Sequence, residues 1–283
     1  MTTASTYTEV STVLDKKPKT NVSARRGNGF SWLVVIIGVI YFFLPLFAVF
    51  EFSLSMIKDQ YSFAAYRAAF SDPRFYRDFG YSMLWAIITI FTSLLLIFPT
   101  AYWVHLRLRR LRPVIEFITL MPFVVPAVVL VFGLIRLYGR PPFSLTSTPL
   151  LLIAGYLTLS MPYMYRAVDT GLRSIDVRTL TEAAQSLGAG WGTILLRIIF
   201  PNLRVAILSG VFLTFAIVMG EFTLASLLGW PAFAPYMEEI GKMRPYTPQA
   251  LSVVSFLLTW GSIVVIQRVG QGGPAQAQVA VGH

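Results

Sequence analysis

The feature that most constrains this sequence is a set of long apolar runs with few or no charges. Residues 30–50 and 81–104 contain no Asp, Glu, Lys or Arg, and a transmembrane helix needs about 20 such residues. Because a backbone in lipid must satisfy its own hydrogen bonds, runs of this length predict helices. Barrel strands would be shorter and would alternate apolar with polar residues. The chain is therefore predicted to be an all-α membrane protein.

The composition narrows the class of protein further. Hydrophobic residues make up 55% of the 283 positions and charged residues 13%, against about 25% charged residues in a soluble domain. A soluble globular fold and a disordered chain are both disfavoured. The net charge of +10 indicates loops that face membrane lipid rather than nucleic acid. With no Cys, and with His105 and His283 far apart, we expect no disulfide, no metal site and no cofactor.

Six apolar stretches are long enough to cross a membrane, so six transmembrane helices are predicted. They are residues 30–50, 81–104, 113–135, 149–165, 205–229 and 250–266. The third contains Glu116 and the fifth contains Glu221. Glu116 lies near the inner arginines, where it can pair or reach the surface. Glu221 is predicted to lie in the outer half of the bilayer, where an ionisable group usually faces a cavity or a partner.

The lysine and arginine residues set the orientation. With the N-terminus inside, fifteen of the 23 Lys and Arg residues fall on inner segments and eight on outer ones. The positive-inside rule then places both termini in the cytoplasm of a multi-pass protein. We expect disordered cytoplasmic tails at residues 1–29 and 269–283, on either side of a six-span domain at 30–268. The first apolar run is too long for the core of a secretory leader.

The inner segment at residues 166–204 has a helical pattern of its own. Ser174 or Asp176 can cap a helix start, and Gly188 and Gly190 can end that helix in a tight turn. The expected apolar face consists of Val177, Leu180, Ala183 or Ala184, and Leu187.

A second short helix is predicted over residues 191–200, and Pro201 marks the entry to the fifth span. The segment therefore predicts a cytoplasmic helix hairpin between the fourth and fifth spans. Short helices presented to the cytoplasm suit docking to a partner protein. The alternative is an amphipathic connector that has no partner.

The spacing of residues in this hairpin resembles the EAA motif, which identifies the permease subunits of ATP-binding-cassette (ABC) importers. The matching residues are Glu182, Ala183, Ala184, Gly188, Ile198 and Pro201. Phe200 stands where the usual pattern has Leu. Met121-Pro122 with Pro126 resembles the proline-containing third span of this family, and the sequence from 237 to 266 is most like the spermidine/putrescine permeases. The resemblance covers about residues 30–268.

This resemblance implies a type I importer fold in the bacterial cytoplasmic (inner) membrane. Two permease subunits, either two copies or two related chains, would pack face to face. Two cytoplasmic ABC ATPases would bind below them and an extracytoplasmic solute-binding protein outside. The hairpin would dock on the ATPase: Glu182 would pair with a group on that subunit, Ala183 and Ala184 would allow close approach, and Gly188 would set the turn. The alternative for Glu182 is a solvated charge on an exposed face.

The chain itself is predicted not to be an enzyme. The phosphate-binding pattern G-x-x-x-x-G-K-[ST] is absent, and Lys242, which follows Gly241, precedes Met243. ATP hydrolysis would therefore belong to a partner chain. Two other functions stay open from the residues alone. One is a secondary transporter driven by an ion gradient, and the other is a scaffold that recruits a cytoplasmic partner.

The stretch from Met219 through Gly220, Glu221 and Phe222 resembles one found in permeases for polyamines, iron, thiamine and sulfate-type solutes. Glu221 and Phe222 are the candidate pathway residues, and a polyamine is the preferred solute. Two interpretations of Glu221 remain open. Its carboxylate either lines the outer pathway, or serves structure by pairing with Arg136 or Lys242 or by a helix-packing hydrogen bond.

Overall fold

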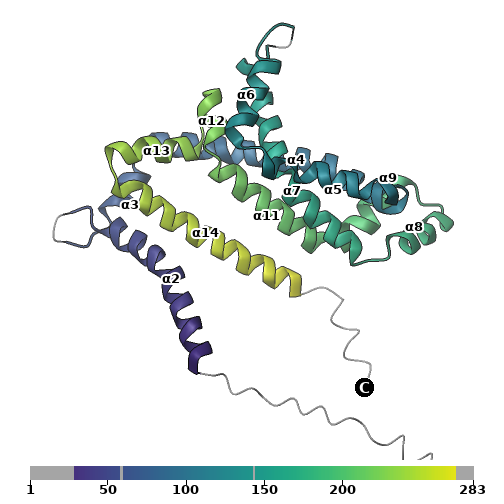
Figure 1. The fold of residues 1–283 in the computed structure, drawn as a ribbon, viewed down its shortest axis with the longest axis horizontal. Helices are drawn as coiled ribbons and strands as arrows, with labels where there is room; N and C mark the ends of the chain where they lie inside the picture. Colours follow the sequence, from purple (N-terminus) through teal and green to yellow (C-terminus); the bar gives the residue numbers. More distant parts are fainter. Residues whose placement is uncertain (1–28, 58–59, 143, 272–283) are drawn as a thin grey trace, which may run out of the picture. The chain divides into compact units, whose positions relative to one another are not determined.

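The computed structural model describes residues 29–57, 60–142 and 144–271. These residues form helices and connecting loops, with one isolated bridge between Ile57 and Gln60. This confirms the all-α prediction for the described part of the chain. Most of each predicted tail lies outside the described residues, and the last helix ends at Gln271, three residues beyond the predicted boundary. Figure 1 shows the order of the helices along the chain.

The chain divides into two compact units, residues 1–48 and 49–283. The first contains most of helix α2 (Gly29–Leu54), which corresponds to the first predicted span. Its large apolar side chains, including Trp32, Phe42 and Phe47, are exposed. A helix that is apolar all round and exposed is typical of a segment whose partner is lipid or another protein.

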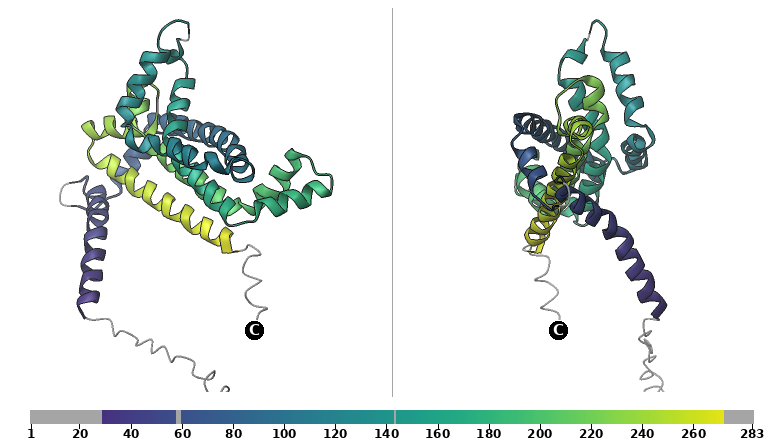
Figure 2. Two further views of the ribbon diagram at one scale, coloured as in Figure 1. Left: turned by 45° about the vertical axis from the view of Figure 1, so that its right-hand side comes forward. Right: turned by 90° about the vertical axis from the view of Figure 1, so that its left-hand side faces the viewer.

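The core of the second unit is a bundle of three helices, α4 (Pro73–Leu106), α7 (Leu150–Arg173) and α11 (Arg204–Gly220). Their buried side chains form one cluster around Tyr102, Met164 and Leu203, and a second around Trp85 and Tyr156. The first cluster lies at the end of this bundle that carries residues 174–203, and the second lies at the end next to α12 (Thr223–Leu228). Both ends can be followed in Figure 2.

Glycines bring α7 and α11 close together. A Cβ atom on Gly210 would lie 2.9 Å from the Cβ of Ala167, and one on Gly171 would lie 2.7 Å from the Cβ of Ala206. Real Cβ atoms do not approach this closely, so a larger residue at either glycine forces the helices apart. Small residues facing each other are a common means of packing membrane helices.

The third predicted span is broken into α5 (Arg112–Val124) and α6 (Ala127–Tyr138), whose axes differ by 102°. Pro126 causes the break, because proline cannot donate the helical hydrogen bond and forces the preceding residue out of the helical region. Val125 is accordingly extended, with ψ 115°. The sequence places a proline here but does not show how large the bend is.

Three further helices of the second unit lie before α4 or after α12 in the chain. These are α3 (Ala64–Phe70), α13 (Phe233–Met243) and α14 (Tyr246–Gln271), with two 3₁₀ turns at Arg109–Leu111 (η1) and Leu145–Ser147 (η2). The aromatic ring of Phe75 packs with Phe233 and Tyr236, which joins α13 to the start of α4. Phe52 stacks on Tyr246 with ring centroids 4.6 Å apart.

The length and apolar composition of each helix decide whether it can cross a membrane. By length and composition, Ser31–Leu54 and Pro73–Leu106 can each cross a membrane as single helices, and two bent helix pairs raise this number to as many as four in the described residues. Helices α7 and α14 occupy the predicted fourth and sixth spans. Six spans therefore remain a prediction.

Candidate functional site

Residues 174–203 fold as a hairpin of two short helical arms, and Asp176 precedes the first arm. The carboxylate of Asp176 accepts hydrogen bonds from the backbone N–H of Thr179 at 3.1 Å and from its hydroxyl at 2.7 Å. This cap satisfies a backbone donor at the start of α8 (Val177–Ser186). The hydroxyl of Thr179 is also the main reason why the pKa of Asp176 lies below its usual value. The carboxylate is therefore ionised at neutral pH, as a cap requires.

The hairpin turns at Gly188, whose φ of 78° lies in the left-handed region. The amide of Gly188 donates to the carbonyl of Gln185, and that of Ala189 donates to the carbonyl of Ala184, which closes the end of α8. A Cβ at Gly188 would meet no atom within 4 Å. The constraint at Gly188 is therefore its backbone conformation and not lack of space.

The second arm consists of α9 (Trp191–Thr193), the π-helix η3 (Ile194–Ile199) and α10 (Phe200–Asn202). This arm meets α11 at an angle of 82° near Leu203. The side chain of Ile198 packs against the core cluster, whereas Pro201 is exposed at the bend. The predicted second helix and the proline at the entry to the fifth span are thus both found.

Two contacts hold the hairpin against α4. The hydroxyls of Thr181 and Tyr102 lie 2.8 Å apart and are both buried. The rings of Trp191 and Trp103 have centroids 4.7 Å apart. The guanidinium of Arg107 lies over both indole rings, at 5.3 and 5.6 Å from their centroids. The hairpin is therefore anchored on α4 at both of its arms.

The residues of the EAA-like motif divide into a buried face and an exposed face. Ala184 is 5% exposed and packs inward, whereas Glu182 and Ala183 face outward. The carboxylate of Glu182 pairs with Arg178 one turn earlier, with Nε and Oε1 2.7 Å apart. Leu187 is 88% exposed, so its predicted place on the apolar face is wrong. The buried face consists of Val177, Thr181 and Ala184.

A network of charged side chains lies near the end of the three-helix bundle that carries the hairpin. The carboxylate of Asp169 is buried and contacts Arg112 at 3.1 Å, Arg173 at 2.6 Å and the ring of His105 at 3.4 Å. Glu116 bridges the same two arginines, at 3.0 and 2.8 Å, so of the two predicted behaviours, pairing or reaching the surface, the structure shows the pairing. No sequence pattern indicated Asp169, because its partners on α4 and α5 are remote in the chain.

Glu221 lies in a short break between α11 and α12. Its two carboxylate oxygens accept the backbone N–H groups of Thr223 at 2.9 Å and Leu224 at 2.8 Å. Glu221 therefore caps the start of α12. The proposed pairing with Lys242 is not formed, since Lys242 pairs with Glu238; within the described residues no ion pair joins Glu221 to Arg136 either. Phe222, beside it, is 41% exposed.

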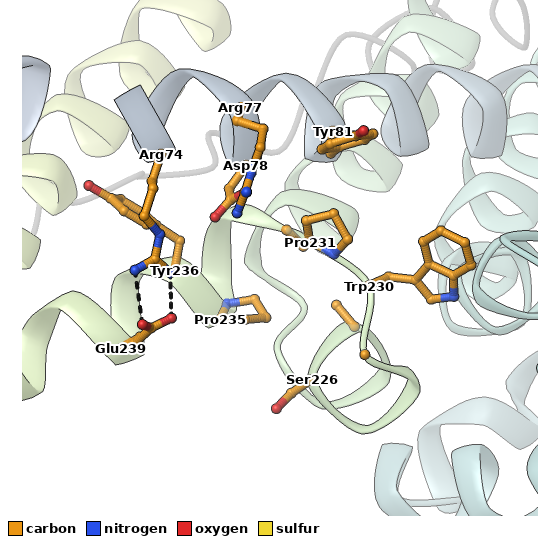
Figure 3. A pocket seen from close by; sticks show the side chains of 13 residues that line it. Arg74, Arg77, Asp78, Tyr81, Ser226, Trp230, Pro231, Pro235, Tyr236 and Glu239 are labelled. Carbon is orange, nitrogen blue, oxygen red and sulfur yellow. Dashed lines mark hydrogen bonds and ion pairs between the residues drawn. The ribbon is translucent and has the colours of Figure 1, made fainter. Parts of the chain in front are cut away.

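A pocket of about 510 Å³ lies between the start of α4 and the α12–α13 connection (Figure 3). Arg74 of α4 forms two parallel hydrogen bonds to Glu239 of α13, at 2.9 and 2.5 Å. The side chain of Arg77 binds the buried carboxylate of Asp78 at 2.7 Å. The side chains of Tyr81 and Trp230 form part of its wall. The pocket carries two guanidinium and two carboxylate groups, so its charge is balanced.

Exchanging the charges at Arg74 and Glu239 tests whether this pair fixes α13 to α4. The Arg74 guanidinium lowers the pKa of the Glu239 carboxyl, so the pair persists at neutral pH and is lost only as the pH falls through that lowered pKa. We expect Arg74→Glu alone to lower the thermal unfolding midpoint measured by size-exclusion chromatography of heated samples. Combining it with Glu239→Arg should restore most of the loss. No recovery in the double variant would contradict a specific pair.

No group of three or more His, Asp or Glu side chains placed to hold a metal ion occurs in the parts of the chain that the structure describes. The candidate site consists of a helix hairpin, a broken helix pair and a pocket.

The arrangement of helices is similar to that of a solved transporter, and the family match defines the class of protein. The fold matches that of a solved bacterial ABC transporter involved in the import of the acidic polysaccharide alginate, with a TM-score of 0.60 and 17% identity, over 88% of this chain and 97% of that one. Residues 97–271 match the family described as binding-protein-dependent transport system inner membrane component. The chain belongs to this family, and it is a type I ABC importer permease.

Several curated proteins are similar in sequence. The spermidine/putrescine transport system permease protein PotB of Salmonella typhimurium is 25% identical over 70% of this chain and 76% of its own length, and that of Escherichia coli K12 is 24% identical over 70% and 79%. A probable molybdenum ABC transporter permease protein of Haloferax volcanii is 30% identical over 61% and 67%. Membership of this family makes the chain a multi-pass inner-membrane transport subunit without catalytic activity of its own.

Proposed function

We propose that this permease forms half of a solute pathway and is driven by a separate ATPase that binds the hairpin at residues 166–204. The observation that carries the proposal is the exposed surface from Glu182 to Leu187 on a hairpin whose opposite face is buried against α4. Leu187, 88% exposed on this anchored element, is the apolar side chain that the proposal assigns to the contact with the ATPase. Both termini would lie in the cytoplasm, as the distribution of Lys and Arg indicates.

The site residues have distinct proposed roles. On the hairpin, Glu182 and Ala183 would contact the ATPase directly, and Ala184 would hold α8 against α4. Gly188 would set the turn. Ile198 and Pro201 would join the second arm to α11. Arg178 already neutralises Glu182 in the free chain, so docking would exchange this exposed pair for contacts with the ATPase.

The proposed solute is a polyamine. The support is the similarity to permeases of spermidine/putrescine transport systems. The Haloferax relative, named for molybdenum, makes an oxyanion the competing solute class. The balanced charge of the pocket beside Arg74 fits either one. A second permease chain, two ATPase copies and an extracytoplasmic solute-binding protein would complete the importer.

The decisive experiment combines purification with transport. Tagged chain would be purified gently from its own membranes, its companions identified by mass spectrometry, and the complex reconstituted in vesicles. We expect an ABC ATPase, a second permease and a binding protein, and ATP-dependent uptake of labelled spermidine. Uptake of molybdate instead would change the solute and keep the mechanism. Uptake by the chain alone, driven by an ion gradient without ATP, would contradict the proposal.

Replacing Glu221 separates its two proposed roles. Glu221→Gln keeps one carbonyl oxygen to accept a backbone N–H and removes the charge, whereas Glu221→Ala removes both. If the charge attracts a cationic solute, both variants reduce uptake about tenfold and assembly is unchanged with Gln. If Glu221 serves only as a cap, the Gln variant transports normally and the Ala variant alone loses stability, by about 1 kcal/mol. Uptake and unfolding of each variant distinguish these results.

A further inference from the structure

A second pocket lies where the end of α4 meets the hairpin, apart from the pocket beside Arg74. It has a volume of about 490 Å³ and is bounded by the end of α4, the turn η1 and the first helix of the hairpin. The side chains that matter for its chemistry are Arg107, Arg109, Arg110 and Arg178, together with Leu108 and Leu111. None of the residues that line this pocket is acidic.

The positive charge of this pocket is largely uncompensated. Of its four arginines, only Arg178 forms an ion pair among the described residues, with Glu182. Arg107 lies over two indole rings, and Arg109 donates to the carbonyl of His105 at 3.4 Å. For Arg110 no ion pair or hydrogen bond is formed with any described residue.

The neighbouring arginines behave differently. Arg112, directly after η1, is bound by both Glu116 and Asp169. Carboxylates are therefore available in this part of the fold, but within the described chain none pairs with Arg107, Arg109 or Arg110, and only Glu182 reaches a pocket arginine, Arg178. Three guanidinium groups that form no ion pair with a described residue and share one cavity repel each other unless an anion enters, and the planar guanidinium matches the oxygens of a phosphate group.

The apolar residues of the pocket indicate where such a phosphate comes from. Leu108 is 44% exposed and Leu111 is 48% exposed, and they alternate with the arginines at the end of the long apolar helix α4. Exposed leucines between arginines are expected where acyl chains meet headgroups. With the orientation proposed above, the pocket lies on the cytoplasmic side, where basic pockets bind anionic lipid headgroups.

We propose that the pocket formed by Arg107, Arg109, Arg110 and Arg178 binds the phosphate of an anionic phospholipid headgroup. The bound phosphate would touch α4 through Arg107 and α8 through Arg178, and so would tie the hairpin to the membrane surface. The guanidinium of Arg107 already lies over the rings of Trp103 and Trp191, which restricts where it can be placed. Lipid composition would then influence the hairpin through which the ATPase is proposed to act.

The test uses the full chain with its companion subunits, purified in neutral detergent. Binding of phosphatidylglycerol and of phosphatidylcholine with the same acyl chains is titrated by native mass spectrometry. The double variant Arg109→Gln/Arg110→Gln removes two charges that form no ion pair in the described chain. The matched control Arg197→Gln/Arg204→Gln removes two exposed charges from the same predicted side, outside the pocket.

We expect phosphatidylglycerol to bind in preference to phosphatidylcholine. The pocket variant should bind phosphatidylglycerol at least tenfold more weakly, while binding by the control variant changes less than twofold.

Inorganic phosphate at millimolar concentration should not displace the lipid. If it does, the pocket selects a free phosphate ion, which keeps the phosphate chemistry and rejects the lipid source. Equal weakening in both double variants would show general attraction to a basic protein and would overturn the proposal. The proposal would also be overturned if the pocket variant bound lipid as the wild type does but lost the ATPase. That result would indicate an acidic protein surface as the partner of the pocket.

This test is independent of the proposed transport function. Lipid binding is measured without transport or ATP hydrolysis, so a chain that imports no polyamine can still show the site. Conversely, if uptake requires ATP but not phosphatidylglycerol, the importer function stands.

Discussion

Substituting valine for Gly188 is expected to abolish ATP-driven uptake while the chain still folds and inserts. The φ of 78° at this position costs a β-branched residue about 1–2 kcal/mol or more. The open space around it does not relieve this cost, because the strain is in the backbone. The turn would rearrange, and the exposed surface from Glu182 to Leu187 would be displaced from the position it has on α4. We expect the ATPase to bind at least tenfold more weakly and hydrolysis to lose its dependence on solute.

The matched control for this substitution is Gly190→Val. Gly190 belongs to the same turn, also has open space around it, and has φ −75° and ψ 163°, which valine adopts readily. This variant should retain most of the ATPase binding and uptake. Glu182→Lys adds a second measurement, because it leaves the turn intact, removes the carboxylate and repels Arg178. If both Gly188→Val and Glu182→Lys assemble and transport normally, the hairpin is only a connector.

Substituting leucine for Gly210 is expected to have the largest effect on the folded chain. Even a Cβ there would lie 2.9 Å from the Cβ of Ala167, which has no flexible end that could move away. Helices α7 and α11 would have to separate, which usually costs about 1–3 kcal/mol and exceeds the small gain in helix propensity over glycine. We expect a lower thermal unfolding midpoint and less folded protein in the membrane, with Gly210→Ala between wild type and Leu.

The control is Gly133→Leu on α6. A Cβ at Gly133 meets no atom within 4 Å, and leucine favours a helix by nearly 1 kcal/mol over glycine. The same substitution should therefore leave the midpoint unchanged or raise it. If the two leucine variants unfold at the same temperature, close contact between α7 and α11 does not limit stability.

The helices were largely predictable because lipid imposes a simple length rule on apolar runs. The cap at Asp176 and the turn at Gly188 were also predictable, since both depend on local backbone chemistry. Leu187 shows where a local rule fails. Its spacing places it on the apolar face of α8, but the turn begins at this residue and directs its side chain outward, where it is 88% exposed.

Contacts between distant parts of the chain could not be predicted from one sequence. The partners of Asp169 include Arg112, 57 residues earlier, and no pattern of spacing relates the two. Arg74 and Glu239 are separated by 165 residues. Glu221 shows a third kind of limit, because its capping role depends on a break in the helix that an apolar run does not reveal. Only the break makes the amides of Thr223 and Leu224 available.

The attachment of the hairpin to α4 has a mechanical consequence. Tyr102 and Trp103 are consecutive residues that hold different arms of the hairpin, so they fix its direction as well as its position. Helix α4 has 34 residues and is thus about 50 Å long. A tilt of only about 10° about its hairpin end would carry the other end through about 9 Å at this length. Arg74 and Asp78 lie at that other end, so a small rotation of the hairpin that tilts α4 as a rigid rod becomes a large displacement of the pocket beside Arg74.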